Sequence, residues 1–90
     1  MSDSTRIVSA ANVLPAALAS LRALGFVVTP TDDGRLLRAD GPGCTLLAED
    51  HIALLGLAKL HEIRGKEWRP TEEEIDAFLA LDEQISPEQK

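Results

Sequence analysis

The stretch that decides the fold is residues 26–39, which read FVVTPTDDGRLLRA. Two β-prone runs, 26–29 and 35–39, flank the dipeptide Asp33-Gly34. An Asp-Gly pair between two such runs is among the strongest short signals for a tight hairpin, because both turn positions favour positive φ. The sequence therefore predicts an antiparallel β-hairpin.

The side chains on the two strands predict the register of this hairpin. A two-residue loop places Val28 opposite Ala39 and Pro30 opposite Leu37, whereas a three-residue loop would mix apolar and polar side chains on both faces. The even register gives one apolar face: Phe26, Val28, Pro30, Leu37 and Ala39. The opposite face carries Thr29, Thr31, Leu36 and Arg38. Pro30 has no N–H for a ladder bond, so we expect either a sheet edge there or a loop widened to residues 31–34.

Helical patterns lie on both sides of the hairpin. Residues 13–24 repeat apolar side chains at helical spacing, with Asn12 as a possible cap and Gly25 as the stop. After the turn Gly41-Pro42-Gly43, residues 44–47 form a third short strand or an extended lead into the next helix.

The second helix is predicted from Asp50 (or Glu49) to about Arg64, with Gly65 as its stop. Its apolar residues spread around nearly the whole circumference, so we expect cover on more than one side. A third helix starts at Thr71, where a glutamate three residues on completes a capping box. Its apolar stripe is Ile75, Phe78, Leu79 and Leu81.

Length and composition limit the possible classes of protein. Ninety residues with 44% hydrophobic content make one small domain, 1–90, for which we expect loose ends at about 1–8 and 86–90. Only three aromatic residues are present, so the core is lean and a homodimer is expected to add burial. A single cysteine, no visible secretory signal and no long apolar run predict a cytoplasmic protein that does not enter membranes.

Charge is placed unevenly along the chain. Residues 1–48 carry four acidic and four basic side chains, whereas residues 49–90 carry eleven acidic and five basic ones, so the net charge of −6 belongs to the second half. A net acidic surface repels phosphate backbones and suits a basic protein partner. We therefore expect no nucleic-acid binding.

No set of residues requires catalysis, a cofactor or a metal. His61-Glu62 begins like a zinc-protease helix, but Gly65 stands where the second histidine ligand is needed. Cys44 would be a nucleophile only if the fold brought His51 or His61 to it, and a small buried thiol is the simpler interpretation. We therefore predict that the protein is not an enzyme.

Trp68, the only tryptophan, lies between Lys66 and Arg69 in the segment before the third helix. Such a cluster suits an interface anchor or stacking on a base. The structural alternative is that Trp68 fills the gap between the last two helices, because an aromatic-poor core seldom leaves its largest side chain in water.

Three segments of the chain resemble TubC-type N-terminal docking domains of peptide and polyketide synthetases. They are LPAALASLRALGFVV (residues 14–28), Asp33-Gly34-Arg35-Leu36, and the Leu-rich helix with Leu54, Leu55, Leu57 and Lys59. The resemblance covers roughly residues 13–60. It implies an αββαα fold, a homodimer, and a hairpin surface that receives a partner subunit's terminal segment. Val27, Thr29, Leu36 and Arg38 would then lie on or near the partner-binding strands. The Trp68 segment and the acidic last helix depart from this pattern.

Together these patterns predict an α+β fold in which three helices pack on a hairpin or three-stranded antiparallel sheet. The predicted function is a non-enzymatic protein–protein interaction module, with a partner bound at the hairpin edge or at an apolar, acid-flanked helix face. The alternative is a small acidic inhibitor of the immunity or antitoxin type that covers a basic protein. The candidate partner-binding residues are Val27, Thr29, Leu36, Arg38, Trp68, Glu72, Glu73 and Asp76.

Overall fold

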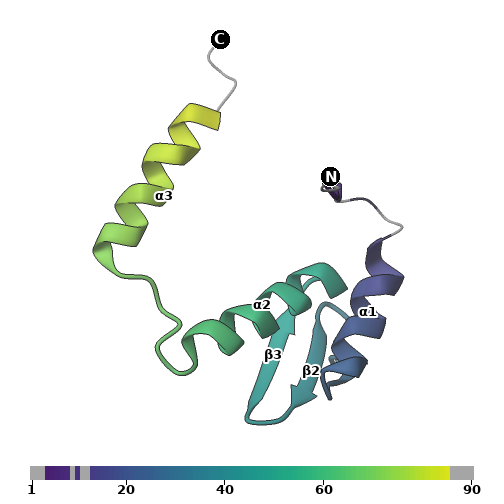
Figure 1. Cartoon of the computed structure of the whole chain (residues 1–90). Coiled ribbons are helices and arrows are strands. Elements are labelled where there is room, and N and C mark those ends of the chain that lie inside the picture. The colour runs from purple at the N-terminus through teal and green to yellow at the C-terminus, as the bar shows by residue number, and fades with distance from the viewer. Residues whose placement is uncertain (1–3, 9, 11–12, 86–90) are drawn as a thin grey trace.

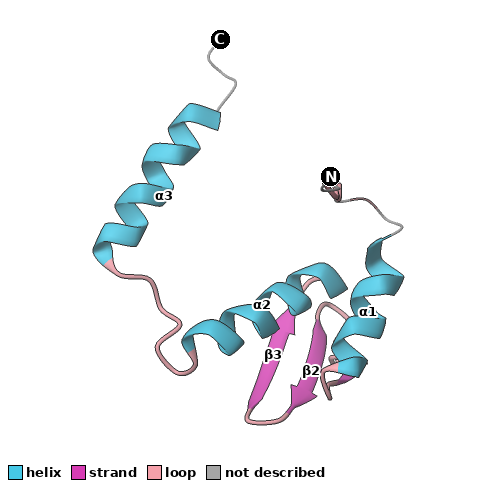
Figure 2. Ribbon diagram, viewed as in Figure 1, coloured by secondary structure: helices cyan, strands magenta, loops and turns pink. Residues whose placement is uncertain are grey.

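The computed structural model of the chain describes residues 4–8, 10 and 13–85. Its elements are α1 (Leu14–Ala23), β1 (Val27–Pro30), β2 (Leu37–Gly41), β3 (Cys44–Ala48), α2 (His51–Arg64) and α3 (Glu72–Ile85). Three helices and one three-stranded antiparallel sheet confirm the predicted α+β class (Figures 1 and 2). Of the two predicted loose ends, residues 4–8 carry no helix or strand, whereas 1–3 and 86–90 lie outside the described residues.

The sheet has the strand order β1-β2-β3, and its first register is the predicted one. Val28 pairs with Ala39 and Pro30 pairs with Leu37. Pro30 lies on β1, which is an edge strand, so its missing N–H leaves no gap in the interior of the sheet. The register predicted from the apolar face is therefore confirmed. The predicted loop of two or four residues is wrong, because β2 begins only at Leu37 and the connection comprises residues 31–36.

The loop between β1 and β2 is held by one threonine and one aspartate. The Thr31 hydroxyl donates to Asp33 Oδ1 at 2.6 Å, and the backbone N–H of Arg35 donates to the same oxygen at 3.0 Å. These hydrogen bonds, with the one to Thr31 first, lower the pKa of Asp33 below its ordinary value. Gly34 supplies the positive φ of 73° that the turn needs.

β3 is a strand, which settles the choice left open by the sequence. Leu46 pairs with Ala39, and Gly41 pairs with Cys44 across the two-residue turn. The turn fits its sequence, because proline presets its own φ and Gly43 takes a φ of 81°.

The core lies between one face of the sheet and the helices α1 and α2. Its buried side chains are Leu21, Phe26, Ala39, Leu46, Leu54 and Ala58. α2 begins as predicted, because the Asp50 carboxylate accepts from the N–H of Ala53 at 2.8 Å, and it ends at Gly65 with a φ of 62°. The proposed cap of α1, Asn12, lies outside the described residues.

The Phe26 ring packs directly over the backbone of Gly41. A Cβ atom at Gly41 would lie 2.3 Å from two ring carbons of Phe26, so no other residue fits there without moving the ring. Phe26 is only 8% exposed and belongs to the core. The glycine at the end of β2 is therefore what lets the aromatic side chain just before β1 enter the core.

α3 stands apart from the rest of the chain (Figure 1). It makes no extended packing contact with any other described element, whereas α1 and α2 pack on each other and on the sheet. The radius of gyration is 15.9 Å, compared with about 12 Å for a compact domain of this length. The expectation that all three helices pack on the sheet is thus wrong for α3, because nothing on the body covers its apolar stripe.

Candidate interaction site

The start of α3 is fixed by a complete capping box. The N–H of Glu74 donates to the Thr71 hydroxyl at 3.1 Å, and the N–H of Thr71 donates to the Glu74 carboxylate at 2.9 Å. Both bonds satisfy backbone donors that have no partner inside the helix. The predicted cap is confirmed, and α3 is a well-formed helix despite its lack of tertiary cover.

Arg64 joins the end of α2 to the start of α3 through residues 65–71, which we call the hinge. Its guanidinium donates to the carbonyl of Glu67 at 3.2 Å, to the carbonyl of Arg69 at 3.3 Å and to the Glu74 carboxylate at 2.9 Å. The hydrogen bond from Arg64 is the largest cause that holds the pKa of Glu74 below its ordinary value. One side chain therefore sets the direction in which α3 leaves the body, and we call this set of bonds the Arg64 clamp.

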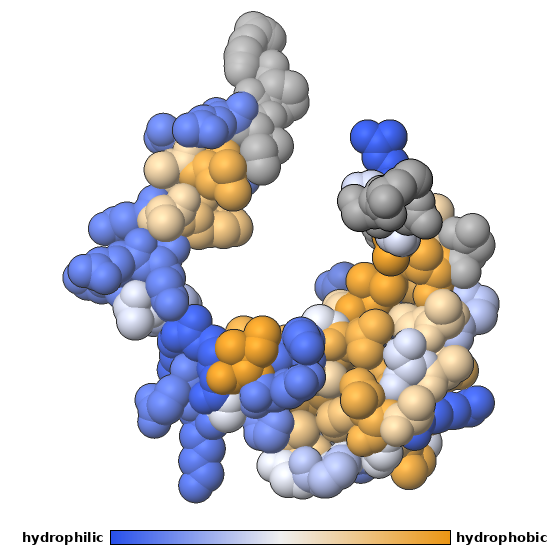
Figure 3. Space-filling view, in the orientation of Figure 1, coloured by the Kyte–Doolittle hydropathy of each residue, from blue (hydrophilic) through white to orange (hydrophobic). Residues whose placement is uncertain are grey.

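The apolar stripe of α3 (Ile75, Phe78, Leu79 and Leu81) is open to solvent. These four side chains are 43 to 64% exposed, and Phe78 is the most exposed of them. Figure 3 shows hydrophobic atoms of α3 on the side that faces the open space between this helix and the body, with hydrophilic atoms on the outer side. An exposed stripe of this kind is a candidate interaction surface.

All of the net charge of the chain lies on α3. Residues 1–71 contain eight acidic and eight basic side chains, and residues 86–90 contain one of each. Residues 72–85 contain six carboxylates and no base, which accounts for the net charge of −6. The charged side chains that flank the apolar stripe on α3 are thus all negative.

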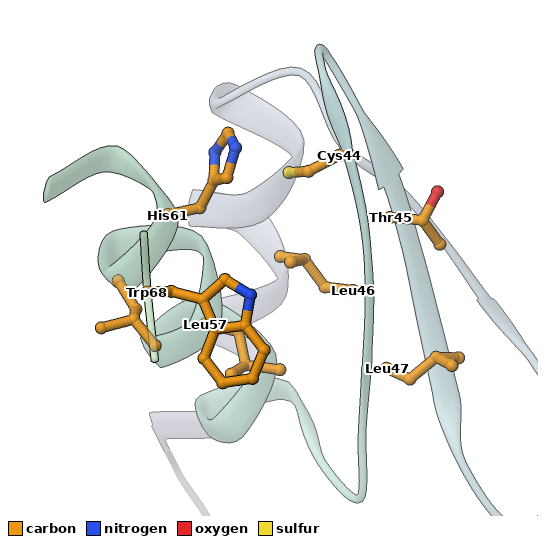
Figure 4. Close-up of a pocket in the computed structure, with 8 residues that line it drawn as sticks. Cys44, Thr45, Leu46, Leu47, Leu57, His61 and Trp68 are labelled. Carbon is orange, nitrogen blue, oxygen red and sulfur yellow. The ribbon is translucent and has the colours of Figure 1, made fainter. Parts of the chain in front are cut away.

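A second feature is a cavity of about 240 Å³ between β3, α2 and the hinge (Figure 4). Its walls include Cys44, Leu46, Leu57, Leu60, His61 and Trp68, and we call it the Trp68 cavity. Leu46 from β3 and Leu57 from α2 give it an apolar interior, and the indole of Trp68 lies beside Leu57. The cavity is therefore suited to an apolar group.

Trp68 lies at the cavity and not between the last two helices. Its side chain is 46% exposed, and the Arg69 guanidinium lies over the indole with its carbon 4.7 Å from the ring centroid. The expectation that Trp68 fills the gap between α2 and α3 is thus wrong, because α3 does not pack there. The Arg69 guanidinium, which lies on the tryptophan face at the rim of the cavity, favours ligands that carry carboxylate or carbonyl oxygens.

Cys44 shares the Trp68 cavity with His61 rather than with His51. Their side chains point toward one another across one end of the cavity (Figure 4), but no hydrogen bond joins them. Among the described residues, no three histidine, cysteine or acidic side chains are grouped as metal ligands. The cavity thus holds a thiol and an imidazole without the metal-binding set that its residue types could suggest.

The strand residues expected to bind a partner lie elsewhere. Val27, Thr29 and Arg38 are exposed on the sheet face that α1 and α2 leave uncovered, whereas Leu36 is half-buried in the loop before β2. Arg38 donates to Asp40 at 2.9 Å, and this hydrogen bond is the main reason why the pKa of Asp40 lies below its ordinary value. This face is the usual solvated face of an antiparallel sheet.

Glu72, Glu73 and Asp76 are exposed on α3, which does not pack on the sheet. The structure thus divides the candidate residues into a sheet-face group, the Trp68 cavity and the acidic helix. It does not bring these three groups into one site.

Sequence reasoning did not identify the cavity or the clamp. Strand alternation places Cys44 and Leu46 on one face of β3. Helical spacing likewise places Leu57, Leu60 and His61 on one face of α2. The space between these two faces arises only from the tertiary packing. The contacts of Arg64 to the carbonyls of Glu67 and Arg69 also depend on the path of the hinge, which no local pattern of the sequence predicts.

Comparison with known proteins gives no relative: no family model, no curated protein and no solved structure matches the chain. None of the helices in the described part of the chain has the length and hydrophobicity needed to span a bilayer.

Proposed function

We propose that this chain is a non-enzymatic protein–protein interaction module whose contact surface is the apolar stripe of α3. One observation carries the proposal: four large apolar side chains project from a capped helix that no other described element covers. An amphipathic helix in this state is suited to lie in an apolar groove of a partner, with anchors at helical spacing.

Charge defines the chemistry of the partner. Six carboxylates and no base surround the stripe, so a complementary surface combines an apolar groove with cations at its rim. Such complementarity speeds encounter and rejects acidic partners, including nucleic acids. The proposed partner is thus a protein with a basic, apolar groove.

A small acidic inhibitor of the immunity or antitoxin type is the second candidate function. The concentration of the whole net charge on one projecting helix favours it, because this helix can cover a basic active surface. The two candidates differ in one measurable respect, since an inhibitor abolishes the activity of the protein that it binds and a docking module does not.

The uncovered sheet face is a weaker candidate surface. The resemblance to docking domains places a partner segment near Val27, Thr29 and Arg38, and β1 is an open edge next to them. This edge is four residues long and ends in a proline, which limits strand addition. We therefore place the primary contact on α3. From the sequence we retain two further proposals, a homodimer and a cytoplasmic location.

The proposal is tested by affinity capture from a lysate of the source organism, with two matched variants. Phe78→Glu puts one charge in the centre of the stripe, and Ala80→Glu puts the same charge on the opposite side of the same exposed helix. We expect the wild type and Ala80→Glu to capture the same protein, released by raised salt, and Phe78→Glu to lose it. Equal capture by both glutamate variants would contradict the proposal.

Trp68→Ala extends the experiment to the cavity. Because Trp68 is half-exposed and outside the regular elements, this substitution leaves the core intact. If Trp68→Ala loses capture while Phe78→Glu retains it, the contact surface is the Trp68 cavity and not α3.

A further inference from the structure

We infer that the groove that receives α3 is the Trp68 cavity of a second copy of this chain. In the resulting dimer each copy places its apolar stripe on the other, and each Phe78 enters the partner's cavity. This inference rests on the proposed function, since it names the partner of the α3 surface.

The cavity fits the side chain in size and in chemistry. A volume of about 240 Å³ exceeds the roughly 150 Å³ that holds a benzene ring in an apolar protein cavity. The walls from Leu46, Leu57 and Leu60 are aliphatic, and the indole of Trp68 offers an aromatic edge. Phe78 is the only aromatic residue of α3 and the most exposed of the four residues of the stripe.

Charge complementarity favours this contact over a direct pairing of two α3 helices. A pair of α3 helices would bring together twelve carboxylates, six from each, with no base in either helix. At the Trp68 cavity, Arg69 lies over the indole, and Lys66, two residues before Trp68, is exposed. The hinge also contains Glu67, so its residues 65–71 carry two bases and one acid, whereas α3 carries six acids and no base. The acidic helix therefore meets a net positive segment at the cavity and only like charges at another α3.

The Arg64 clamp explains why the helix of the same chain does not fill the cavity. Its three hydrogen bonds hold the hinge and the first turn of α3 in an arrangement that directs the helix away from the body. Closure onto the same chain would break these bonds, whereas a second copy can offer its helix with both clamps intact.

Reciprocal exchange would cover five of the large apolar residues that the described chain exposes, namely Trp68 and the four residues of the stripe. The described chain buries seven apolar residues and exposes twelve large ones, which is a small core for a folded domain. In a two-fold dimer both copies use the same two surfaces, the stripe and the cavity, for each other. Both stripes are then covered, and no free stripe or cavity is left to add further copies into a filament.

Disulfide trapping tests the contact directly. Cys44 is the only cysteine and lines the cavity, so Phe78→Cys places a second thiol where the inference puts it within bonding distance of the partner's Cys44. The matched control is Ala80→Cys, on the opposite side of α3. After mild oxidation at high protein concentration, we expect Phe78→Cys to run as a covalent dimer on a denaturing, non-reducing gel. Ala80→Cys should run as a single chain on the same gel, because its thiol lies away from the contact.

A double variant identifies the bond. When Phe78→Cys is combined with Cys44→Ser, the covalent dimer should disappear, whereas its persistence would show a bond between two α3 helices and overturn the inference. A disulfide within one chain, equal trapping of the Ala80→Cys control, or free thiols throughout would overturn it as well. Capture of a different protein that still depends on Phe78 would leave the proposed function standing, so the two failures are distinguishable.

Discussion

Gly41→Ala is the substitution for which the fold makes its sharpest energetic prediction. The added Cβ would lie 2.3 Å from two carbons of the Phe26 ring, whereas ordinary contact begins at 3.4 Å. The ring and the methyl group must therefore separate by about 1.1 Å, the difference between these two distances. The ring is only 8% exposed and belongs to the core cluster, so a shift of the ring disturbs its packing against the other core residues.

The magnitude follows from the two ways in which the core can respond. Overpacking with shifted side chains costs about 1–3 kcal/mol. Complete expulsion of the ring forfeits the burial of one large side chain, about 1.5–3 kcal/mol. We therefore expect Gly41→Ala to lower the free energy of unfolding by about 2 kcal/mol, which is a large share of the ~5 kcal/mol typical at the lower end for folded domains.

Urea denaturation followed by circular dichroism measures this loss, with all variants at one protein concentration because association contributes to stability. Gly56→Ala is the control, since nothing lies within 4 Å of a Cβ there and the position is in the middle of α2. The control should gain about 0.5–1 kcal/mol. If both substitutions shift the urea midpoint in the same direction, the account of Phe26 over Gly41 is refuted.

Three further predictions concern α3 and the cavity. Thr71→Ala should weaken the helix by about 1 kcal/mol, seen as faster amide hydrogen exchange in α3 with unchanged exchange in the sheet. Equal acceleration in both would mean that α3 and the sheet open as one unit, against the separate α3 of this structure. Glu74 has a lowered pKa, so its contribution to stability is present above the ordinary glutamate pKa of about 4.3 and is lost as the pH falls through the lowered value. Helicity of α3 should therefore decrease in acid below that range, as followed by NMR. Arg64→Gln should reduce this pH dependence without abolishing it, because the hydrogen bond from the Thr71 backbone N–H also lowers the pKa of Glu74. Cys44 should react slowly with a thiol reagent at neutral pH in the wild type, because the helix of the second copy covers the cavity. In Phe78→Glu this cover is lost, and the reaction should be several-fold faster. A fast reaction in the wild type would instead favour thiol chemistry with His61.

The hairpin shows which parts of the fold were accessible from the sequence. Its register follows from local signals, namely the turn dipeptide and the alternation that puts Val28 and Ala39 on one face, and both are independent of the rest of the chain. The caps at Asp50 and Thr71 are similar, because a cap and its target lie within three residues. Such features require no knowledge of tertiary contacts.

The position of α3 was not accessible in this way. An amphipathic pattern reports that one face is apolar, but it does not say whether the cover comes from the same chain or from another. That choice depends on the hinge, where Arg64 reaches two carbonyls and a carboxylate through contacts that span up to ten residues. The Trp68 cavity was missed for a related reason, since a cavity is what several elements leave unfilled and no single segment encodes it.

Sedimentation equilibrium tests the central claim, that the apolar stripe of α3 is covered by a second copy, most directly. The wild type should have a mass of about 19 kDa, twice the 9.7 kDa of one chain, and the Ala80→Glu control should match it. Phe78→Glu should sediment at 9.7 kDa with unchanged circular dichroism of its folded body. A wild type that remains at 9.7 kDa at high concentration would contradict the account.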